Sequence, residues 1–326
     1  MHASVFLMGA LNVDSPALTA LLPVVLIILC GVAAAKVGWI RASALKDLSQ
    51  LVFYVLTPAL LFRTMASVRI AELDFKPTLV YFLAAGIVFA GTLLYYGFNT
   101  AAATRALGHT FSNNVMIGIP LIGLVYGKEG LVVLLTLISV HALVLLGSGT
   151  MILEFAQARE RSGAGRPQGL LRTVGQAVKN SVLHPVPLPI IAGLLFAQTG
   201  WSLPPVVDKP LQLLGVALGP MALLLVGVTL AYSRIGALVK PALRMASIKI
   251  LIHPLVFLGV AWALSLQGLP MAAMGLAAAL PTGANVLMFA QRYGVGEQEI
   301  TASIALGTMC SLVTVPAMLL LISALQ

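Results

Sequence analysis

The stretch TFSNNVMIGIP, residues 110–120, decides the fold of this chain, and the stretch ALPTGANVLM, residues 279–288, has the same character. Each places asparagine, glycine and proline in the middle of an apolar segment. Proline removes a helical hydrogen bond, and glycine lets the backbone leave helical geometry. The freed backbone groups need partners in the protein or in a watery cavity, and asparagine amides carry both donors and acceptors. We therefore predict two broken helices; the alternative is two ordinary proline kinks.

The composition places these stretches in a membrane. The 326 residues are 60% hydrophobic and 9% charged, whereas soluble domains are about 25% charged. The apolar residues form blocks of the ~20 residues that a helix needs to cross the hydrocarbon core, without the alternation of barrel strands. We predict an all-α integral membrane protein whose partner is the lipid bilayer.

The charges and cysteines do not indicate another class. The net charge of +9 fits lysines and arginines gathered in cytoplasmic loops, so no nucleic-acid binding is expected. Cys30 and Cys310 lie inside apolar spans, where a cysteine usually packs as a small apolar residue. We expect no cofactor and no metal site.

Ten transmembrane helices are expected, and the two interrupted stretches fall in the fourth and the ninth. The spans cover residues 18–37, 48–66, 79–98, 101–126, 131–153, 183–200, 211–232, 246–267, 270–292 and 300–324. If the long central loop is cytoplasmic, 13 lysines and arginines lie in the loops on that side and five on the other. This bias predicts a multi-pass protein of the cell's inner membrane with both termini on the outer face.

The central loop divides the chain into two halves. We expect a first five-helix repeat at residues 1–156, a basic cytoplasmic loop at 157–181 and a second five-helix repeat at 182–326. Five crossings are an odd number, so the second half begins on the opposite face and any duplication is inverted. Two weak echoes support a repeat: LTPALL at 56–61 resembles LGPMAL at 218–223, and the fourth and ninth spans both end at Tyr-Gly.

The polar groups within the spans favour an anion as ligand. The half-helices that begin at the two breaks would point the positive ends of their dipoles at it, and no span carries a carboxylate near its middle. Lys249 is the one cation placed inside a span; it could attract an anion, neutralise the carboxyl ends of the half-helices, or extend to the cytoplasmic interface. For His141 and His253 we favour packing over contact with substrate or protons.

The sequence resembles the auxin efflux carrier family, in particular its bacterial malonate-transporter-like branch, over essentially the whole chain. The resemblance rests on LTPALLF at 56–62, NNVMIGIPL at 113–121 and ALPTGANV at 279–286. It implies two inverted five-helix repeats in which spans four and nine cross. Spans one, two, six and seven would form a scaffold and the others a mobile transport domain, as in an elevator. Family substrates are organic anions such as indole acetate and dicarboxylates.

The resemblance also implies which residues line the crossing. The predicted substrate-binding set is Asn113, Asn114, Gly118, Pro120, Pro281, Thr282, Gly283 and Asn285, with a charge role open for Lys249. Two departures from the plant carriers stand out. This chain has Val286 where they have proline, and their acidic residue in the third span has no counterpart that we can locate.

We therefore predict a secondary transporter, not an enzyme. It would move a small organic anion, a malonate-like dicarboxylate or another weak acid, by alternating access. The alternatives are a sodium- or proton-coupled symporter of the same architecture and an anion channel. A membrane enzyme is disfavoured because the acids lie at loops and span ends and the histidines are scattered. The sequence leaves a homodimer open.

Overall fold

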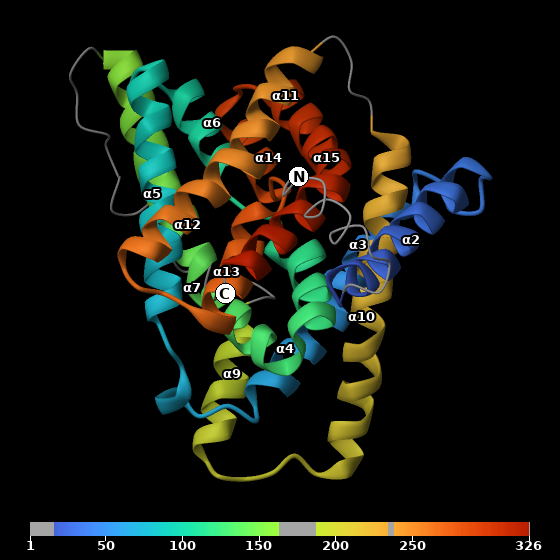
Figure 1. The fold of residues 1–326 in the computed structure, drawn as a ribbon. Helices are drawn as coiled ribbons and strands as arrows, with labels where there is room; N and C mark the ends of the chain where they lie inside the picture. Colours follow the sequence, from blue (N-terminus) through green and yellow to red (C-terminus); the bar gives the residue numbers. More distant parts are fainter. Residues whose placement is uncertain (1–15, 163–186, 234–237, 326) are drawn as a thin grey trace, which may run out of the picture.

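The computed structural model describes residues 16–162, 187–233 and 238–325, and these residues form helices joined by short connections (Figure 1). The helices of the first half are α2 (Pro16–Lys36), α3 (Ala44–Leu51), the π-helical turn η1 (Val52–Leu56), α4 (Thr57–Met65), the 3₁₀ turn η2 (Ile70–Glu72), α5 (Lys76–Tyr96), α6 (Thr100–Thr110), the π-helical turn η3 (Asn114–Gly118) and α7 (Ile119–Ser162). Those of the second half are α9 (Pro187–Gln198), α10 (Pro205–Tyr232), α11 (Val239–Ser247), the π-helical turn η4 (Ile248–Ile252), α12 (His253–Ala263), α13 (Gly268–Ala279), α14 (Asn285–Tyr293) and α15 (Glu297–Ala324).

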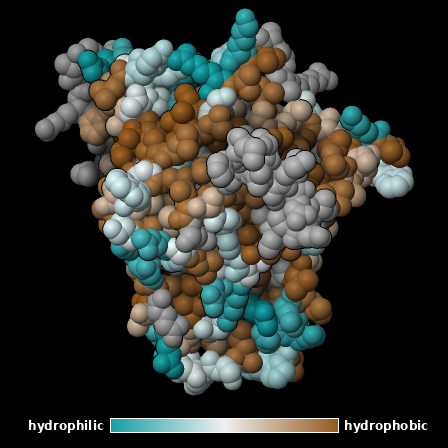
Figure 2. Space-filling model, viewed as in Figure 1, coloured by the Kyte–Doolittle hydropathy of each residue, from teal (hydrophilic) through white to brown (hydrophobic). Residues whose placement is uncertain are grey.

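The surface is that of a membrane protein. Within the described residues, six helical segments are long and apolar enough to cross a membrane: Ala44–Met65, Lys76–Tyr96, Asn114–His141, Pro205–Tyr232, Val239–Ala263 and Glu297–Ala324. Three shorter apolar helices accompany them, at Leu22–Lys36, Leu188–Gln198 and Gly268–Ala279. In Figure 2 hydrophilic side chains gather toward the two ends of the visible face, and hydrophobic ones spread between them. Many large apolar side chains lie on this surface, among them Leu94 and Trp262 at 86% and 84% exposed, as expected where helices face lipid.

Two details differ from the expected boundaries. α7 contains Gly127 with φ 61° and ψ −152°, so two helical segments meet there, at the turn expected after the fourth span. α7 then continues to Ser162, beyond position 157 where the central loop was expected to begin. The rest of that loop lies outside the described residues.

Each of the three π-helical turns ends two residues before a proline: Pro58, Pro120 or Pro254. Proline cannot donate the N–H that would close the preceding helical turn, and a widened turn is one way to absorb the gap. At η1 the backbone N–H and the hydroxyl of Thr57 both donate to the carbonyl of Val52, the hydroxyl at 2.8 Å. Pro220, in contrast, lies inside the continuous helix α10.

The helices pack in two groups, which we name for use below. In the α2/α10 group, α2 and the α3–η1–α4 segment pack on α10, and α9 packs on α4. In the crossing group, α5 packs on α6 and α12, α11 on α15, and α13 on α7, α12 and α15. Figure 1 shows α2, α3 and α10 on one side of the molecule and α5, α6 and α12 on the other.

Glycines bring helices of the α2/α10 group into backbone contact. A Cβ added to Gly31 would lie 2.0 Å from the carbonyl oxygen of Leu224 and 3.1 Å from the Cα of Gly227. A Cβ added to Gly193 would lie 2.6 Å from the carbonyl oxygen of Phe62 and 3.1 Å from the Cβ of Met65. Equivalent members of the two contacts are 162 residues apart in the chain (31 and 193, 62 and 224, 65 and 227). The α2–α10 contact thus has a counterpart in the α9–α4 contact.

Candidate functional site

The two interrupted stretches meet as extended segments in the crossing group. α6 ends at Thr110, and Ser112 forms an isolated antiparallel bridge with Thr282, which lies between α13 and α14. The N–H of Asn113 donates to the carbonyl of Pro281 at 2.9 Å, and the N–H of Gly283 donates to the carbonyl of Phe111 at 2.8 Å. Each break thus satisfies backbone groups of the other, which lipid could not do. The structure contains two broken helices here, so the proline-kink alternative is wrong.

Side chains complete the crossing. The Thr282 hydroxyl donates to the carbonyl of Gly108 near the end of α6 at 2.8 Å. The Ser112 hydroxyl is 2.8 Å from the Tyr81 hydroxyl of α5. A Cβ at Gly283 would lie 3.1 Å from the carbonyl oxygen of Ser112, so a larger residue would push the paired segments apart.

Lys249 lies at the carboxyl end of α13. Its side chain is fully buried, and its Nζ donates to the carbonyl oxygens of Ala278 at 2.6 Å and Leu280 at 2.7 Å. Of the three roles considered from the sequence, extension to the interface is wrong because the ammonium is buried at the crossing. Lysine bonded to two carbonyls at the negative end of a helix dipole is a favourable arrangement. Lys249 does not line the cavity described next.

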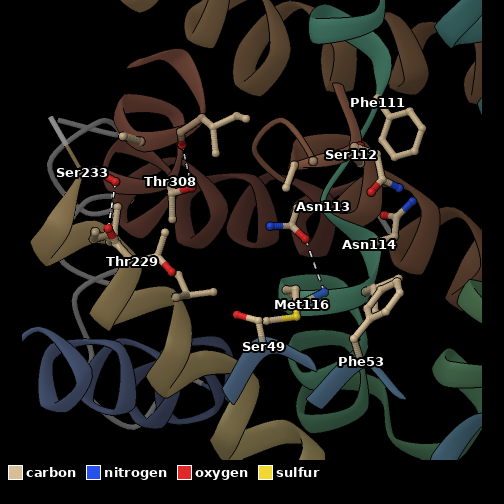
Figure 3. Close-up of a pocket in the computed structure, with 18 of the residues that line it drawn as sticks. Ser49, Phe53, Phe111, Ser112, Asn113, Asn114, Met116, Thr229, Ser233 and Thr308 are labelled. Atoms are coloured by element: carbon tan, nitrogen blue, oxygen red, sulfur yellow. Dashed lines mark hydrogen bonds between the residues drawn. The ribbon is translucent and has the colours of Figure 1, made fainter. Parts of the chain in front are cut away.

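A cavity of about 400 Å³ lies beside the crossing, between the two helix groups (Figure 3). The crossing group contributes Phe111, Ser112, Asn113, Asn114, Val115, Met116, Ile138, His141, Gly283, Ala284, Asn285, Ile304, Ala305 and Thr308. The α2/α10 group contributes Ser49, Phe53, Val226, Thr229, Leu230 and Ser233. Figure 3 shows Asn113 and Asn114 next to each other, with Thr229 and Ser233 on α10 across the cavity.

The helices that begin at the breaks start at this cavity. Asn113 precedes η3, and its side-chain oxygen accepts from the N–H of Met116 at 3.3 Å. α14 begins at Asn285 without a side-chain cap. The first N–H groups of a helix lack intrahelical partners and carry the positive end of its dipole. Among the lining residues of the described chain there is no aspartate or glutamate, and His141 is the ionisable one.

Asn114 is the lining residue whose hydrogen bonds are missing. Its side chain is 3% exposed, and neither its Oδ1 nor its Nδ2 has a hydrogen-bond partner within the described residues. The Tyr81 hydroxyl lies nearby but outside hydrogen-bonding geometry. A buried polar atom without a partner costs about 1–3 kcal/mol. An amide left in this state at a helix start and beside a cavity points to a ligand or water as its partner.

The predicted site residues therefore divide into two sets. Asn113, Asn114, Gly283 and Asn285 line the cavity, whereas Gly118, Pro120, Pro281 and Thr282 do not. Gly118 is buried where a Cβ would lie 2.9 Å from Leu280, and Pro120 lies against Gly219 of α10. Gly118 therefore packs within the crossing, Pro120 packs against the α2/α10 group, and Pro281 and Thr282 take part in the crossing by hydrogen bonds.

Sequence reasoning missed the opposite wall of the cavity. Thr229 lies in the last turn of α10 and Ser233 caps the end of that helix, and each hydroxyl donates to the carbonyl four residues earlier. They stand at the end of an uninterrupted apolar helix, so no break marks them. A serine or threonine pair spaced four apart near the end of a span is the one signal that could have drawn attention to this wall.

The chain is similar in sequence to known membrane transport proteins. The family described as "Membrane transport protein" matches residues 16–319. A protein of Rhizobium meliloti (strain 1021) described as "Putative malonate transporter" is 26% identical over 286 residues, covering 86% of this chain and 87% of that protein. "Auxin efflux carrier component 8" of Arabidopsis thaliana is 21% identical over 241 residues, covering 62% and 66%. "Uncharacterized transporter YfdV" of Escherichia coli (strain K12) is 27% identical over 307 residues, covering 91% and 94%.

Proposed function

The chain belongs to the family of membrane transport proteins that includes the auxin efflux carriers, and from that premise we propose that it is a secondary transporter for a small organic anion. The observation that carries the proposal is the Asn114 amide, buried without a partner where η3 begins beside the cavity. The anion would bind between the starts of η3 and α14, where Asn113, Asn114 and Asn285 present amides.

The charges around the cavity favour an anion over a cation. Two helix starts face the site with their positive ends, and Lys249 neutralises the negative end of α13 close by. No carboxylate among the described lining residues would hold a cation. A malonate-like dicarboxylate or another weak acid fits this environment, and the name of the Rhizobium relative agrees with the first.

The division into two helix groups suggests how the anion crosses the membrane. Within the α2/α10 group, Arg63 on α4 forms an ion pair with Asp208 on α10 at 2.7 Å. Within the crossing group, Arg105 on α6 forms an ion pair with Glu299 on α15 at 2.8 Å. Each group thus contains an ion pair of its own, and the cavity lies between the groups. We propose ten spans in two inverted repeats, with the crossing group sliding against the α2/α10 group as an elevator.

Two further features support the inverted repeat. One is the glycine contact that recurs after 162 residues, between α2 and α10 and between α9 and α4. The other is the crossing itself, in which each break donates one backbone N–H to the other. Both are arrangements that a two-fold axis in the membrane plane would produce.

The basic residues orient the protein in the inner membrane. Ser49 and Ser233 line the cavity toward one end of the α2/α10 group. Three basic residues, Lys36, Arg41 and Lys46, precede Ser49 closely in the chain at this end. The positive-inside rule places this end in the cytoplasm. Both termini would then lie on the outer face, and the structure would represent a state with the site close to the cytoplasmic side.

The test is ligand binding followed by transport. Purified protein should melt at a higher temperature with the anion it binds, because a ligand at 100 times its Kd stabilises the folded state by about 2.7 kcal/mol. We expect a shift with malonate or another member of a mono- and dicarboxylate series. Asn114→Ala should reduce that shift without lowering the melting temperature of the empty protein, because the amide it removes has no partner. Gln212→Ala, which truncates an exposed amide bonded to Lys209, is the matched control.

Transport in proteoliposomes separates the remaining classes. A carrier loaded with unlabelled anion exchanges it for labelled anion, and a channel does not, so absence of counterflow would favour the channel. Uptake that stops when sodium is replaced would favour the sodium-coupled alternative. An unchanged affinity in Asn114→Ala would refute the site.

A further inference from the structure

His141 of α7 is the ionisable side chain at the cavity, and one of its nitrogens is free. The residue is 4% exposed and lines the cavity. Its Nε2 is buried and makes no hydrogen bond within the described residues. The ring lies among aromatic groups, with centroid distances of 4.7 Å to Phe111, 5.8 Å to Tyr81 and 6.1 Å to Phe82. A buried nitrogen without a partner costs about 1–3 kcal/mol, so this ring is not explained by packing alone.

The titratable groups around His141 are basic or neutral. Lys249 of η4 and His253 of α12 are close enough to interact electrostatically with His141. The ring of Tyr81 on α5 lies against both histidine rings, with centroid distances of 5.8 Å to His141 and 5.4 Å to His253. His109 of α6 acts on His253 and is bonded to Thr92. No carboxylate of the described chain belongs to this cluster. A proton on His141 would therefore meet the charge of Lys249 with no negative partner while the cavity is empty.

An anion in the cavity changes this balance. Its carboxylate would supply the missing negative charge, and an opposite charge within about 4–6 Å favours the protonated imidazole. The carboxylate would also be the missing hydrogen-bond partner of Nε2. His253 does not share this position: both of its ring nitrogens lack partners, but it is fully buried and does not line the cavity.

We propose that His141 is a proton-binding residue of the anion site, so that one proton is taken up when the anion binds. This rests on the proposed function of the same cavity. This step requires the neutral ring of the empty site to carry its hydrogen on Nδ1. On binding, the lone pair of Nε2 takes a proton from the water that reaches the cavity, and the new N–H donates to the carboxylate. When the anion leaves, the proton returns to water, so that no other bond is made or broken. Anion and proton would then travel together.

The test measures proton uptake and anion binding on the same purified protein. Malonate, or the acid of the series that binds best, is added at a pH where its own carboxyls are ionised. Calorimetry in buffers of different ionisation enthalpy gives the number of protons taken up per anion. We expect uptake approaching one proton, and an apparent Kd that weakens by about tenfold for each unit by which the pH rises between the pKa of the histidine in the empty site and its pKa with the anion bound. His141→Gln should bind the anion with a Kd that no longer depends on pH, and Gln212→Ala, at an exposed position away from this cluster, should behave as wild type.

The outcomes separate the two proposals. Binding by the wild-type protein without proton uptake would overturn the role of His141 and leave the transporter proposal standing; this result needs no variant to fold. Equal uptake by His141→Gln would overturn it as well. If no acid of the series binds, the proposed function fails and the inference fails with it.

Discussion

The backbone contact between α2 and α10 makes a sharp prediction for Gly227. A Cβ at this position would lie 1.9 Å from the carbonyl oxygen of Ile28 and 2.9 Å from the backbone nitrogen of Val32. Ordinary contact begins near 3.4 Å, so Gly227→Ala forces the two helices apart by about 1.5 Å along this line. The obstructing atoms are backbone, and no change of side-chain rotamer can relieve the clash.

The expected loss of stability follows from that geometry. Overpacking in a tight interior costs about 1–3 kcal/mol and occasionally more. Alanine regains up to about 1 kcal/mol over glycine as a helix former, and this gain is common to every glycine in a helix. Gly259→Ala in α12 measures this gain in helix propensity without a clash, because no atom lies within 4 Å of the added Cβ. Gly193→Ala, with its nearest backbone atom at 2.6 Å, should fall between the two.

The assay is thermal unfolding of the detergent-solubilised protein, followed by tryptophan fluorescence. At about 2 °C per kcal/mol, Gly227→Ala should melt several degrees below wild type. Gly259→Ala should melt at or above the wild-type temperature. If Gly227→Ala and Gly259→Ala melt alike, the contact between the helix backbones does not have the effect inferred here.

Three further changes test other contacts. Lys249→Ala should lower the melting temperature, because two buried carbonyl oxygens lose their hydrogen-bond donor at a cost of about 1–3 kcal/mol each. Partial recovery of the melting temperature with added propylammonium would show that the ammonium group supplies this stabilisation. Thr282→Val should cost about 1 kcal/mol by removing the hydroxyl that caps α6, while Thr282→Ser should not, and equal melting of the two would contradict this role. Arg63→Gln should change the melting temperature little, because the side chains of Arg63 and Asp208 are 35% and 33% exposed and water screens their attraction; a large loss in the same melting assay would contradict this expectation.

The breaks were predictable from the sequence because their cause is local. Proline and glycine interrupt a helix wherever they stand, and Asn113 beside Asn114 offers amides at the same depth. The sequence also predicted that the α6–η3 and α13–α14 breaks would meet. It did not show how they pair, because the hydrogen bond from Asn113 to Pro281 depends on the rotation and depth of two helices far apart in the chain.

The contacts of Lys249, and the wall of the cavity that α10 forms, could not be predicted from the sequence. Lys249 reaches carbonyls of Ala278 and Leu280, and periodicity does not reveal which neighbour a buried face meets. Gly227 and Gly259 are alike in sequence, both within apolar helices, yet one touches a backbone and the other nothing. Tertiary packing decides which atoms surround each glycine, and the local sequence pattern does not reveal that packing.

The paired breaks also have a consequence for how the chain is assembled in the membrane. The partners of the Phe111 carbonyl and the Asn113 N–H are supplied by Gly283 and Pro281, which are synthesised 170 and more residues after Phe111. Until the second half is made, these two backbone groups of the first half lack their partners, and they need water or another protein to bond with if they lie within the membrane. Contacts so distant in sequence form late. The bridge between Ser112 and Thr282 can form only when both halves are present, and the proposed binding site is complete only once it has formed.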